Sequence, residues 1–179
     1  MNEIRIISGE FKGRKIKTPG EKTHPMGERE RIALFNMIFE VLDGERVLDA
    51  FSGSGALGIE ALSRGASFVT FIEKDSNACR VIRGNLEAIG AAQDKYEVVK
   101  ADVYKATEAW IGEGRKYGAV IADPPYDEYD GEKMCNFGGL VANGGVLVLS
   151  HPGDAPEIEG MKLLKTRQYA AAHLSVYVK

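Results

Sequence analysis

The chain has 179 residues, a net charge of −3 and two cysteines, Cys79 and Cys135. This length fits one domain with its own hydrophobic core. Two cysteines exclude a disulfide framework and a four-thiolate metal site, so we expect a reducing, cytoplasmic setting and no metal. No stretch is long and apolar enough for a membrane helix, and the acidic net charge by itself argues against a nucleic-acid partner.

The positive charge is concentrated at the N-terminus. Residues 1–19 carry five basic and two acidic side chains, a net charge of +3, whereas the remaining 160 residues carry −6. Residues 3–8 and 14–18 alternate in part and are separated by two glycines, which predicts a β-hairpin with a basic face. Proline and glycine over 19–27 predict a linker. The hairpin is either a contact surface for a polyanion or a solvated surface without a partner.

The rest of the chain alternates strands and helices. Apolar residues recur at helical spacing from Glu28 to Leu42. Strands are predicted at 46–50, 68–73, 96–100, 118–122 and 146–150, and helices at 56–64, 76–89, 103–111 and within 129–142. This pattern is typical of a parallel sheet covered by helices on both faces. Two last strands, 162–167 and 173–178, have no helix between them and should form an antiparallel hairpin at the sheet edge.

A glycine-rich segment follows the first strand of this sheet. Gly53, Gly55 and Gly58 satisfy G-x-G-x-x-G between a strand and a helix, where glycine permits a tight turn and close approach of a ligand. Glu73 ends the next strand, where a carboxylate would accept hydrogen bonds from ribose hydroxyls. The pattern therefore predicts an adenosine-containing ligand, with a purely structural turn as the alternative.

Two aspartates refine the ligand class. Asp49 precedes the first glycine by four residues, where a carboxylate would repel the pyrophosphate of a nicotinamide or flavin dinucleotide. It would suit the ammonium and sulfonium charges of S-adenosylmethionine. Asp102, after the third strand, resembles in its position the methyltransferase residue that binds the adenine amine. It is also expected as an N-cap of the following helix, and the two roles can coexist.

Asp123-Pro124-Pro125-Tyr126 ends the fourth strand. The prolines stiffen the backbone and remove two N–H donors, so the free polar groups are acceptors, the Asp123 carboxylate and the Pro124 carbonyl. Tyr126 adds a flat apolar face. A base with an exocyclic amine fits this loop, because its N–H bonds need acceptors and its ring needs a stacking partner. A rigid turn without a chemical role is the alternative.

The glycine loop, D-x-F-x-G-x-G, resembles the Rossmann-like methyltransferases. Together with Asp-Pro-Pro-Tyr it resembles those that methylate exocyclic amino nitrogens: adenine N6 of DNA, guanine N2 of RNA, and glutamine of release factors. Further segments resemble the RsmD family, bacterial methyltransferases of guanine N2 in 16S ribosomal RNA. These segments are Ile4–Gly9 with Gly13–Lys15, Arg29 and Arg31 before Ala33–Asn36, and Gly53–Ala66.

The resemblance implies a class I, S-adenosylmethionine-dependent methyltransferase fold. We expect a seven-stranded, mostly parallel sheet with a C-terminal antiparallel hairpin. The single domain, 1–179, would consist of a basic hairpin and linker, 1–27, and a catalytic core, 28–179. It would act as a monomer on 16S ribosomal RNA within a partly assembled small subunit, without a membrane or metal. DNA adenine N6 and protein glutamine remain alternative targets, although no long target-recognition segment is inserted between the strands.

The resemblance also implies roles for individual residues. The residues expected to bind the cofactor are Asp49, Phe51, Ser52, Gly53, Gly55, Gly58, Glu73, Lys74, Asp102 and Val103. Those expected to hold the target base and act in catalysis are Asp123, Pro124, Pro125 and Tyr126. Those expected to meet RNA phosphates are Arg5, Lys12, Arg14, Lys15, Arg29 and Arg31. His24-Pro25-Met26 and Ile32 depart from the family pattern beside the expected RNA entrance.

Overall fold

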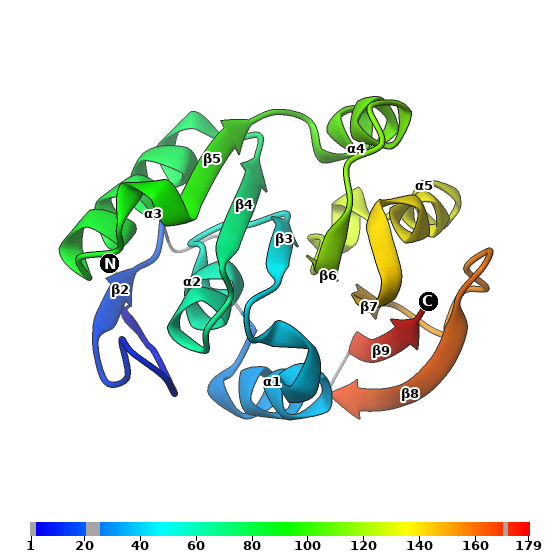
Figure 1. Cartoon of the computed structure of the whole chain (residues 1–179), viewed down its shortest axis with the longest axis horizontal. Helices are drawn as coiled ribbons and strands as arrows, with labels where there is room; N and C mark the ends of the chain where they lie inside the picture. The colour runs from blue at the N-terminus through cyan, green and yellow to red at the C-terminus, as the bar shows by residue number, and fades with distance from the viewer. Residues whose placement is uncertain (1–2, 21–25, 170–171) are drawn as a thin grey trace.

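The computed structural model describes residues 3–20, 26–169 and 172–179, with a seven-stranded sheet at its centre (Figure 1). Its strands lie in the order β5-β4-β3-β6-β7-β9-β8. The strands are β3 (Arg46–Ala50), β4 (Phe68–Glu73), β5 (Tyr96–Lys100), β6 (Tyr117–Ala122), β7 (Val141–His151), β8 (Lys162–Tyr169) and β9 (Ala172–Val178). The first five run parallel, and β9 is antiparallel to both neighbours. The predicted fold class is therefore confirmed.

Helices cover both faces of the sheet (Figure 1). One face carries α1 (Glu28–Leu42), α2 (Ala56–Ser63) and α3 (Ser76–Ala88), and the other carries α4 (Val103–Gly112), α5 (Gly131–Cys135) and the 3-10 turn η3 (Asn136–Leu140). Two more 3-10 turns are η1 (Gln93–Lys95) and η2 (Tyr126–Glu128). Side chains alternate across the sheet, so Val47 and Leu48 enter opposite cores, and both are fully buried. Burial on both faces explains why the central strands are almost wholly apolar.

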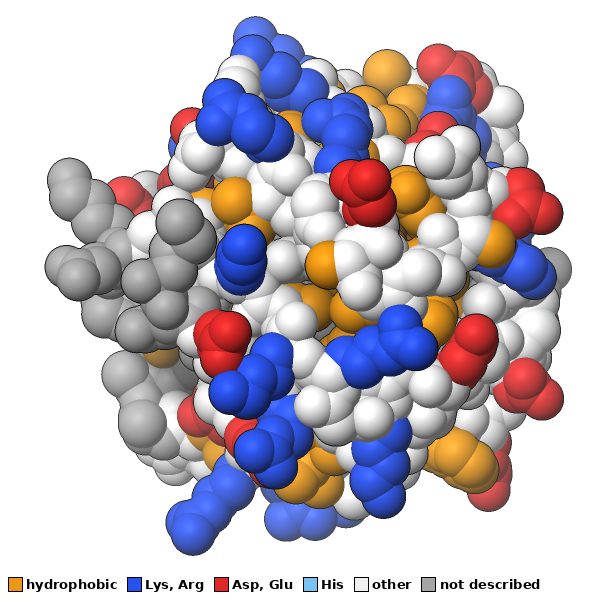
Figure 2. Space-filling model, turned by 90° about the vertical axis from the view of Figure 1, so that its left-hand side faces the viewer, with side chains coloured by type: hydrophobic (Ala, Val, Ile, Leu, Met, Phe, Trp, Pro, Cys, Tyr) orange, Lys and Arg blue, Asp and Glu red, His pale blue; other side chains and the backbone are white. Residues whose placement is uncertain are grey.

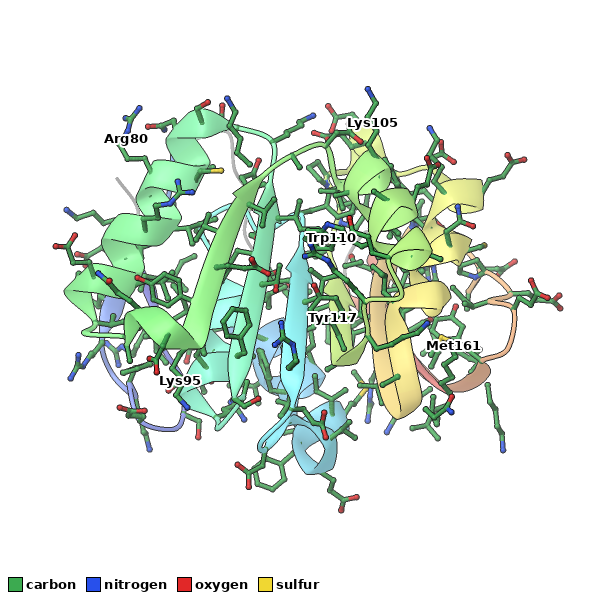
Figure 3. All side chains as sticks on the ribbon, turned by 45° about the horizontal axis from the view of Figure 1, so that its top comes forward. Arg80, Lys95, Lys105, Trp110, Tyr117 and Met161 are labelled. Atoms are coloured by element: carbon green, nitrogen blue, oxygen red, sulfur yellow. The ribbon has the colours of Figure 1, made fainter. Side chains whose placement is uncertain are left out.

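Aromatic packing holds α4 against the sheet. The Trp110 ring lies 6.5 Å from the Tyr117 ring between α4 and the start of β6 (Figure 3). The Arg115 guanidinium covers Trp110 at 4.4 Å from the ring centroid. This anchor fixes the C-terminal half of α4, and the helix thereby presents its N-terminus, with Asp102, at the carboxyl end of the sheet.

The N-terminal hairpin is shorter than the sequence predicted, with strands β1 (Glu3–Arg5) and β2 (Lys15–Lys17). Ile4 and Ile16 point into the core and the flanking charged residues point outward. A buried carboxylate on α2 docks the hairpin, because Glu60 accepts hydrogen bonds from the backbone N–H groups of residues 7 and 8 at 2.8 and 3.1 Å. The hairpin is therefore attached to the helix that follows the glycine loop. The predicted linker falls largely on residues 21–25, outside the described residues.

The segment before β7 differs from the prediction. The helix expected within 129–142 is reduced to α5 and η3, and β7 starts at Val141 rather than at 146. Val141 pairs with Tyr117, and the register then shifts before Ala119 pairs with Val146. Asn143-Gly144-Gly145 lies within this irregularity, so the residues just before the predicted strand belong to a bulged extension of β7. The C-terminal strands pair as predicted and are slightly longer.

The longest helix of the described residues, α1, has 15 residues. Within residues 3–20, 26–169 and 172–179, no helix combines the length and the apolar character needed to cross a bilayer.

Candidate active site

A cavity of about 1080 Å³ opens where the carboxyl ends of β3, β4 and β6 and the start of α4 converge. This is the position at which open α/β sheets bind ligands. Most of the predicted cofactor and target residues line it: Phe51, Ser52, Gly53, Glu73, Lys74, Asp102, Val103, Asp123, Pro124, Pro125 and Tyr126. Two motifs that lie about 70 residues apart in sequence thus face one space.

The glycine loop crosses the floor of the cavity in a strained conformation. Phe51 has a φ of 61°, the positive value that only glycine adopts without cost, and Gly53 and Gly55 have φ of 54° and 78°. The Ser52 hydroxyl ties the loop down by donating to the carbonyls of Asp49 and Ile72 at 2.7 and 3.1 Å. Backbone strain held by such bonds is typical of ligand-binding loops.

Asp49 lies beneath this loop and is not among the residues that line the cavity. It is 1% exposed, and its carboxylate accepts the Gly58 N–H at 2.8 Å in the first turn of α2. Burial raises the pKa of Asp49 to about 8. Gly58 also serves packing, because a Cβ there would lie 2.3 Å from the Phe71 ring. Gly55 likewise shapes the loop from outside the lining, as the left-handed N-cap of α2.

Glu73 connects the end of β4 to the glycine loop. One carboxylate oxygen accepts the Gly53 N–H and the other accepts the Asp75 N–H, both at 2.8 Å. These bonds hold the carboxylate at the cavity wall. The neighbouring Lys74 forms an ion pair with Glu128 at 2.7 Å, which joins the β4 end to the loop after β6.

Asp102 takes the capping role that the sequence allowed. It accepts the Lys105 N–H at 3.0 Å through one oxygen and lines the cavity beside Val103. Two residues later, the Tyr104 hydroxyl donates to the Glu128 carbonyl at 2.7 Å and accepts the Asp130 N–H at 3.0 Å. The first turn of α4 therefore holds the loop that follows Asp123-Pro124-Pro125-Tyr126.

That loop presents acceptors and one exposed ring. Pro124 is buried, whereas Tyr126 is 60% exposed and free to stack on a ligand. The Ser150 hydroxyl, from the end of β7, donates a hydrogen bond to the Asp123 carboxylate. Burial, and to a lesser extent the negative charge of Glu30, raises the pKa of Asp123. A raised pKa makes this carboxylate a better proton acceptor near neutral pH.

The residues expected to meet phosphates fall into two groups. Five are exposed: Arg5, Lys12, Arg14, Lys15 and Arg29. Figure 2 shows Lys and Arg side chains spread over the face on which the hairpin and α3 lie. Arg31 differs from these five, since it is 3% exposed, its guanidinium donates twice to the Arg5 carbonyl at 3.1 Å, and it lines the cavity beside Glu30. It attaches α1 to the hairpin and is not part of the exposed basic surface.

Several residues that the sequence did not single out support the site. Asn85 accepts the Lys17 N–H at 2.8 Å and donates to the carbonyls of Lys17 and Ser54 at 2.9 and 3.0 Å. It thus connects the hairpin to the glycine loop. Polar residues of a predicted helix rarely signal such a role by spacing, because the partners are distant in sequence. Among the described residues, no group of three His, Cys, Asp or Glu side chains is placed to hold a metal ion.

The comparison with known families agrees with this geometry. The family model described as Conserved hypothetical protein 95 matches residues 4–178. The chain belongs to this family, the RsmD family. The prediction of an RNA methyltransferase, as a class of enzyme, is thereby confirmed together with the family.

Relatives of this chain match it over different shares of their length. It is 32% identical to "Putative rRNA methyltransferase YlbH" of Bacillus subtilis over 98% of this chain and 99% of that protein. It is 34% identical to Ribosomal RNA small subunit methyltransferase D of Haemophilus influenzae over 69% of this chain and 64% of the relative. The Escherichia coli protein of the same name is 36% identical over 69% of this chain and 61% of its own length. The chain thus matches slightly less than two thirds of each of these two RsmD proteins.

Solved structures share the fold of this RsmD-family chain along its length. The structure of yhhF from Escherichia coli has a TM-score of 0.85 and 29% identity, covering 98% of this chain and 97% of that chain. A Thermus thermophilus protein, TTHA0928, has a TM-score of 0.80 and 30% identity, covering 97% and 98%. These two proteins therefore share the fold of this chain over nearly its whole length.

Proposed function

We propose that this RsmD-family chain transfers a methyl group from S-adenosylmethionine to the exocyclic N2 amine of a guanine in 16S ribosomal RNA. One observation carries the proposal: the acceptor loop of Asp123 and Pro124 opens into the same cavity as the glycine loop and Glu73. A target amine held by the first pair would thus face a cofactor held by the second. The relatives named Ribosomal RNA small subunit methyltransferase D support this target.

The cavity fits the cofactor on both size and donor chemistry. Its volume of about 1080 Å³ has room for a nucleoside-sized ligand together with a base. At Gly53 an added Cβ would meet its first neighbour only at 4.0 Å, so the backbone is open to a ligand. Glu73 would accept the ribose hydroxyls, and the Asp102 oxygen not used by the cap would accept the adenine amine. When bound, S-adenosylmethionine supplies the electrophilic methyl group.

The target loop would act by positioning and by accepting a proton. An aromatic amine is a poor nucleophile, because its lone pair is delocalised into the ring. If the Asp123 carboxylate and the Pro124 carbonyl accept its two N–H bonds, the lone pair is directed toward the methyl group. The proton released from the nitrogen passes to Asp123, whose raised pKa favours that transfer. The exposed Tyr126 ring would stack on the base, which must leave its own stack to reach the loop.

Only a small part of the chain is available for choosing the RNA. The exposed cations of the hairpin contribute few phosphate contacts, and Lys15 is already paired with Glu3 at 2.8 Å. We therefore expect modest affinity for naked RNA and a faster reaction on a partly assembled small subunit, whose folded RNA and proteins supply further contacts. Equal rates on naked 16S RNA and on particles would contradict this part of the proposal.

Transfer of tritium from labelled S-adenosylmethionine tests the function directly. Unmethylated small-subunit particles should accept label on guanine N2, as read by mass spectrometry of nuclease digests. Asp123→Ala should lower the transfer rate at least about 100-fold, the low end for loss of a general base, and leave the cofactor Kd almost unchanged. The control is Asp94→Ala, an exposed carboxylate in η1, which should behave as wild type.

Three outcomes would overturn the proposal. Label on duplex DNA adenine or on a release-factor glutamine, with none on ribosomal RNA, would assign the site to one of the alternative targets. Intact cofactor binding with no label in any ribosomal fraction would refute the RNA target. A loss of cofactor affinity in Asp123→Ala that equals its loss of rate would refute the assigned role of Asp123.

A further inference from the structure

A groove outside the active-site cavity runs between α1 and the edge strand β8. Its lining consists of Ala33, Asn36, Met37, Leu164, Lys165, Arg167, Tyr169 and Val176. Tyr169 lines the groove and also the active-site cavity, so both spaces border this residue. In Figure 1 the C-terminal end of β8 lies beside α1. The groove therefore leads away from the target pocket along the edge of the sheet.

A bulge in β8 places Lys162 and Lys165 on the same face of the sheet as the groove. Lys162 pairs with Val178 and Lys165 pairs with Val176, with a register shift between Leu163 and Lys165. Val178 and Val176 both pack against the core on the α1 face, so the bulge brings both lysines onto this face. In a regular strand, residues three apart would lie on opposite faces. Arg167, opposite Leu174, continues the row.

The groove is lined by two cations, by apolar side chains and by Asn36 and Tyr169, and its lining contains no carboxylate. Lys165 and Arg167 are its charged residues, and the sequence from 161 to 179 contains four basic residues and no acidic one. Leu164 is 59% exposed beside them. A positively charged groove with an aromatic side chain on which a base can stack, here Tyr169, is the combination that binds single-stranded nucleic acid. Lysines on an edge strand also discourage sheet-to-sheet pairing, and that explanation makes different predictions.

We infer that this groove binds the single-stranded RNA that flanks the target nucleotide. The inference rests on the proposed function, because a base extruded into the cavity leaves its backbone outside the cavity, and Tyr169 borders both the cavity and the groove. Phosphates following that base would meet Arg167 and Lys165, and then Lys162 at the far end. The RNA is thereby held on both sides of the cavity, by the hairpin on one side and by the groove on the other.

Salt-dependent binding of a naked 16S transcript tests the groove. In filter binding, Lys165→Ala/Arg167→Ala should weaken affinity about 10-fold at low salt. It should also reduce the slope of log K against log salt by about 1.4, two phosphates at about 0.7 each for a single strand. The cofactor Kd should not change. The control is Lys105→Ala on α4, an exposed lysine that points into solvent on the other side of the sheet (Figure 3).

A second variant separates shape from charge. Asn36→Trp fills the groove from an exposed position on α1 and leaves its charge intact. We expect affinity to fall several-fold with the salt slope unchanged. If the double variant keeps the wild-type RNA affinity and salt slope, the inference is wrong. It is also wrong if the double variant aggregates with unchanged RNA binding, because the two cations would then serve to prevent pairing of the β8 edge with another sheet. If slope and affinity change as expected but particles accept no methyl group, the groove stands and the proposed function fails.

Discussion

Replacing Asp49 with asparagine tests the buried carboxylate beneath the glycine loop. Asp49 is 1% exposed, and burial raises its pKa from 3.8 to about 8, although the hydrogen bond from the Gly58 N–H acts in the opposite direction. Asparagine keeps the shape and one oxygen that accepts from Gly58. The substitution therefore removes the ionisable group and replaces the other oxygen by an amide nitrogen.

The pH dependence follows from the two protonation states. The carboxyl ionises above about pH 3.8 in the unfolded chain and keeps its proton up to about pH 8 in the folded protein. Between these values the unfolded state binds fewer protons, so the free energy of unfolding falls as pH rises. Each pKa unit corresponds to about 1.4 kcal/mol, which gives a penalty of about 4 kcal/mol at pH 7.

Urea unfolding of the ligand-free proteins measures this penalty. Asp49→Asn should match the wild type at about pH 4 and be more stable by up to about 4 kcal/mol at about pH 7. Asp94→Asn removes an exposed carboxyl and should show no such pH-dependent gap. A gap that stays constant between the two pH values would refute the reasoning. So would a wild type that is the more stable protein at pH 7, because Asp49 would then be ionised and compensated in the fold.

Three further substitutions test residues around the cavity. Gly58→Ala places a Cβ 2.3 Å from the Phe71 ring, so it should lower the free energy of unfolding, measured in urea, by about 1–3 kcal/mol. An unchanged free energy of unfolding would show that α2 and Phe71 can move apart without cost. Glu73→Ala should weaken cofactor binding at least about 10-fold in calorimetry, the loss expected for a charge-assisted bond, and an unchanged Kd would remove Glu73 from the site. Lys74→Ala should cost about 0.5 kcal/mol or less, because its pair with Glu128 is 53% and 28% exposed; a loss above about 1 kcal/mol would make that pair structural.

The sequence predicted the parallel sheet, the glycine loop and the acceptor loop because each depends on local rules. Hydrophobic period, glycine at positive φ and proline geometry act over a few residues, and the carboxyl ends of parallel strands meet at one edge wherever the strands lie. These rules predicted that Gly53, Glu73 and Asp123 lie at one site, and all three line the same cavity in the structure. They failed before 146, the predicted start of the strand, because pairing with distant β6 extends β7 back to Val141 through a bulge.

Tertiary structure alone decided which polar groups are exposed. Arg31 and Asp49 are of the same residue types as the exposed cations and the cavity carboxylates. Both are buried, Arg31 against the hairpin through the Arg5 carbonyl and Asp49 beneath the glycine loop. The groove beside β8 depends likewise on α1, about 130 residues earlier, and on a one-residue register shift that places Lys162 and Lys165 on one face. Composition and spacing determine what a segment can form. Whether a side chain is buried, and which face of the sheet it lies on, depends on the elements that pack against its segment. Both are therefore defined only when the chain has folded.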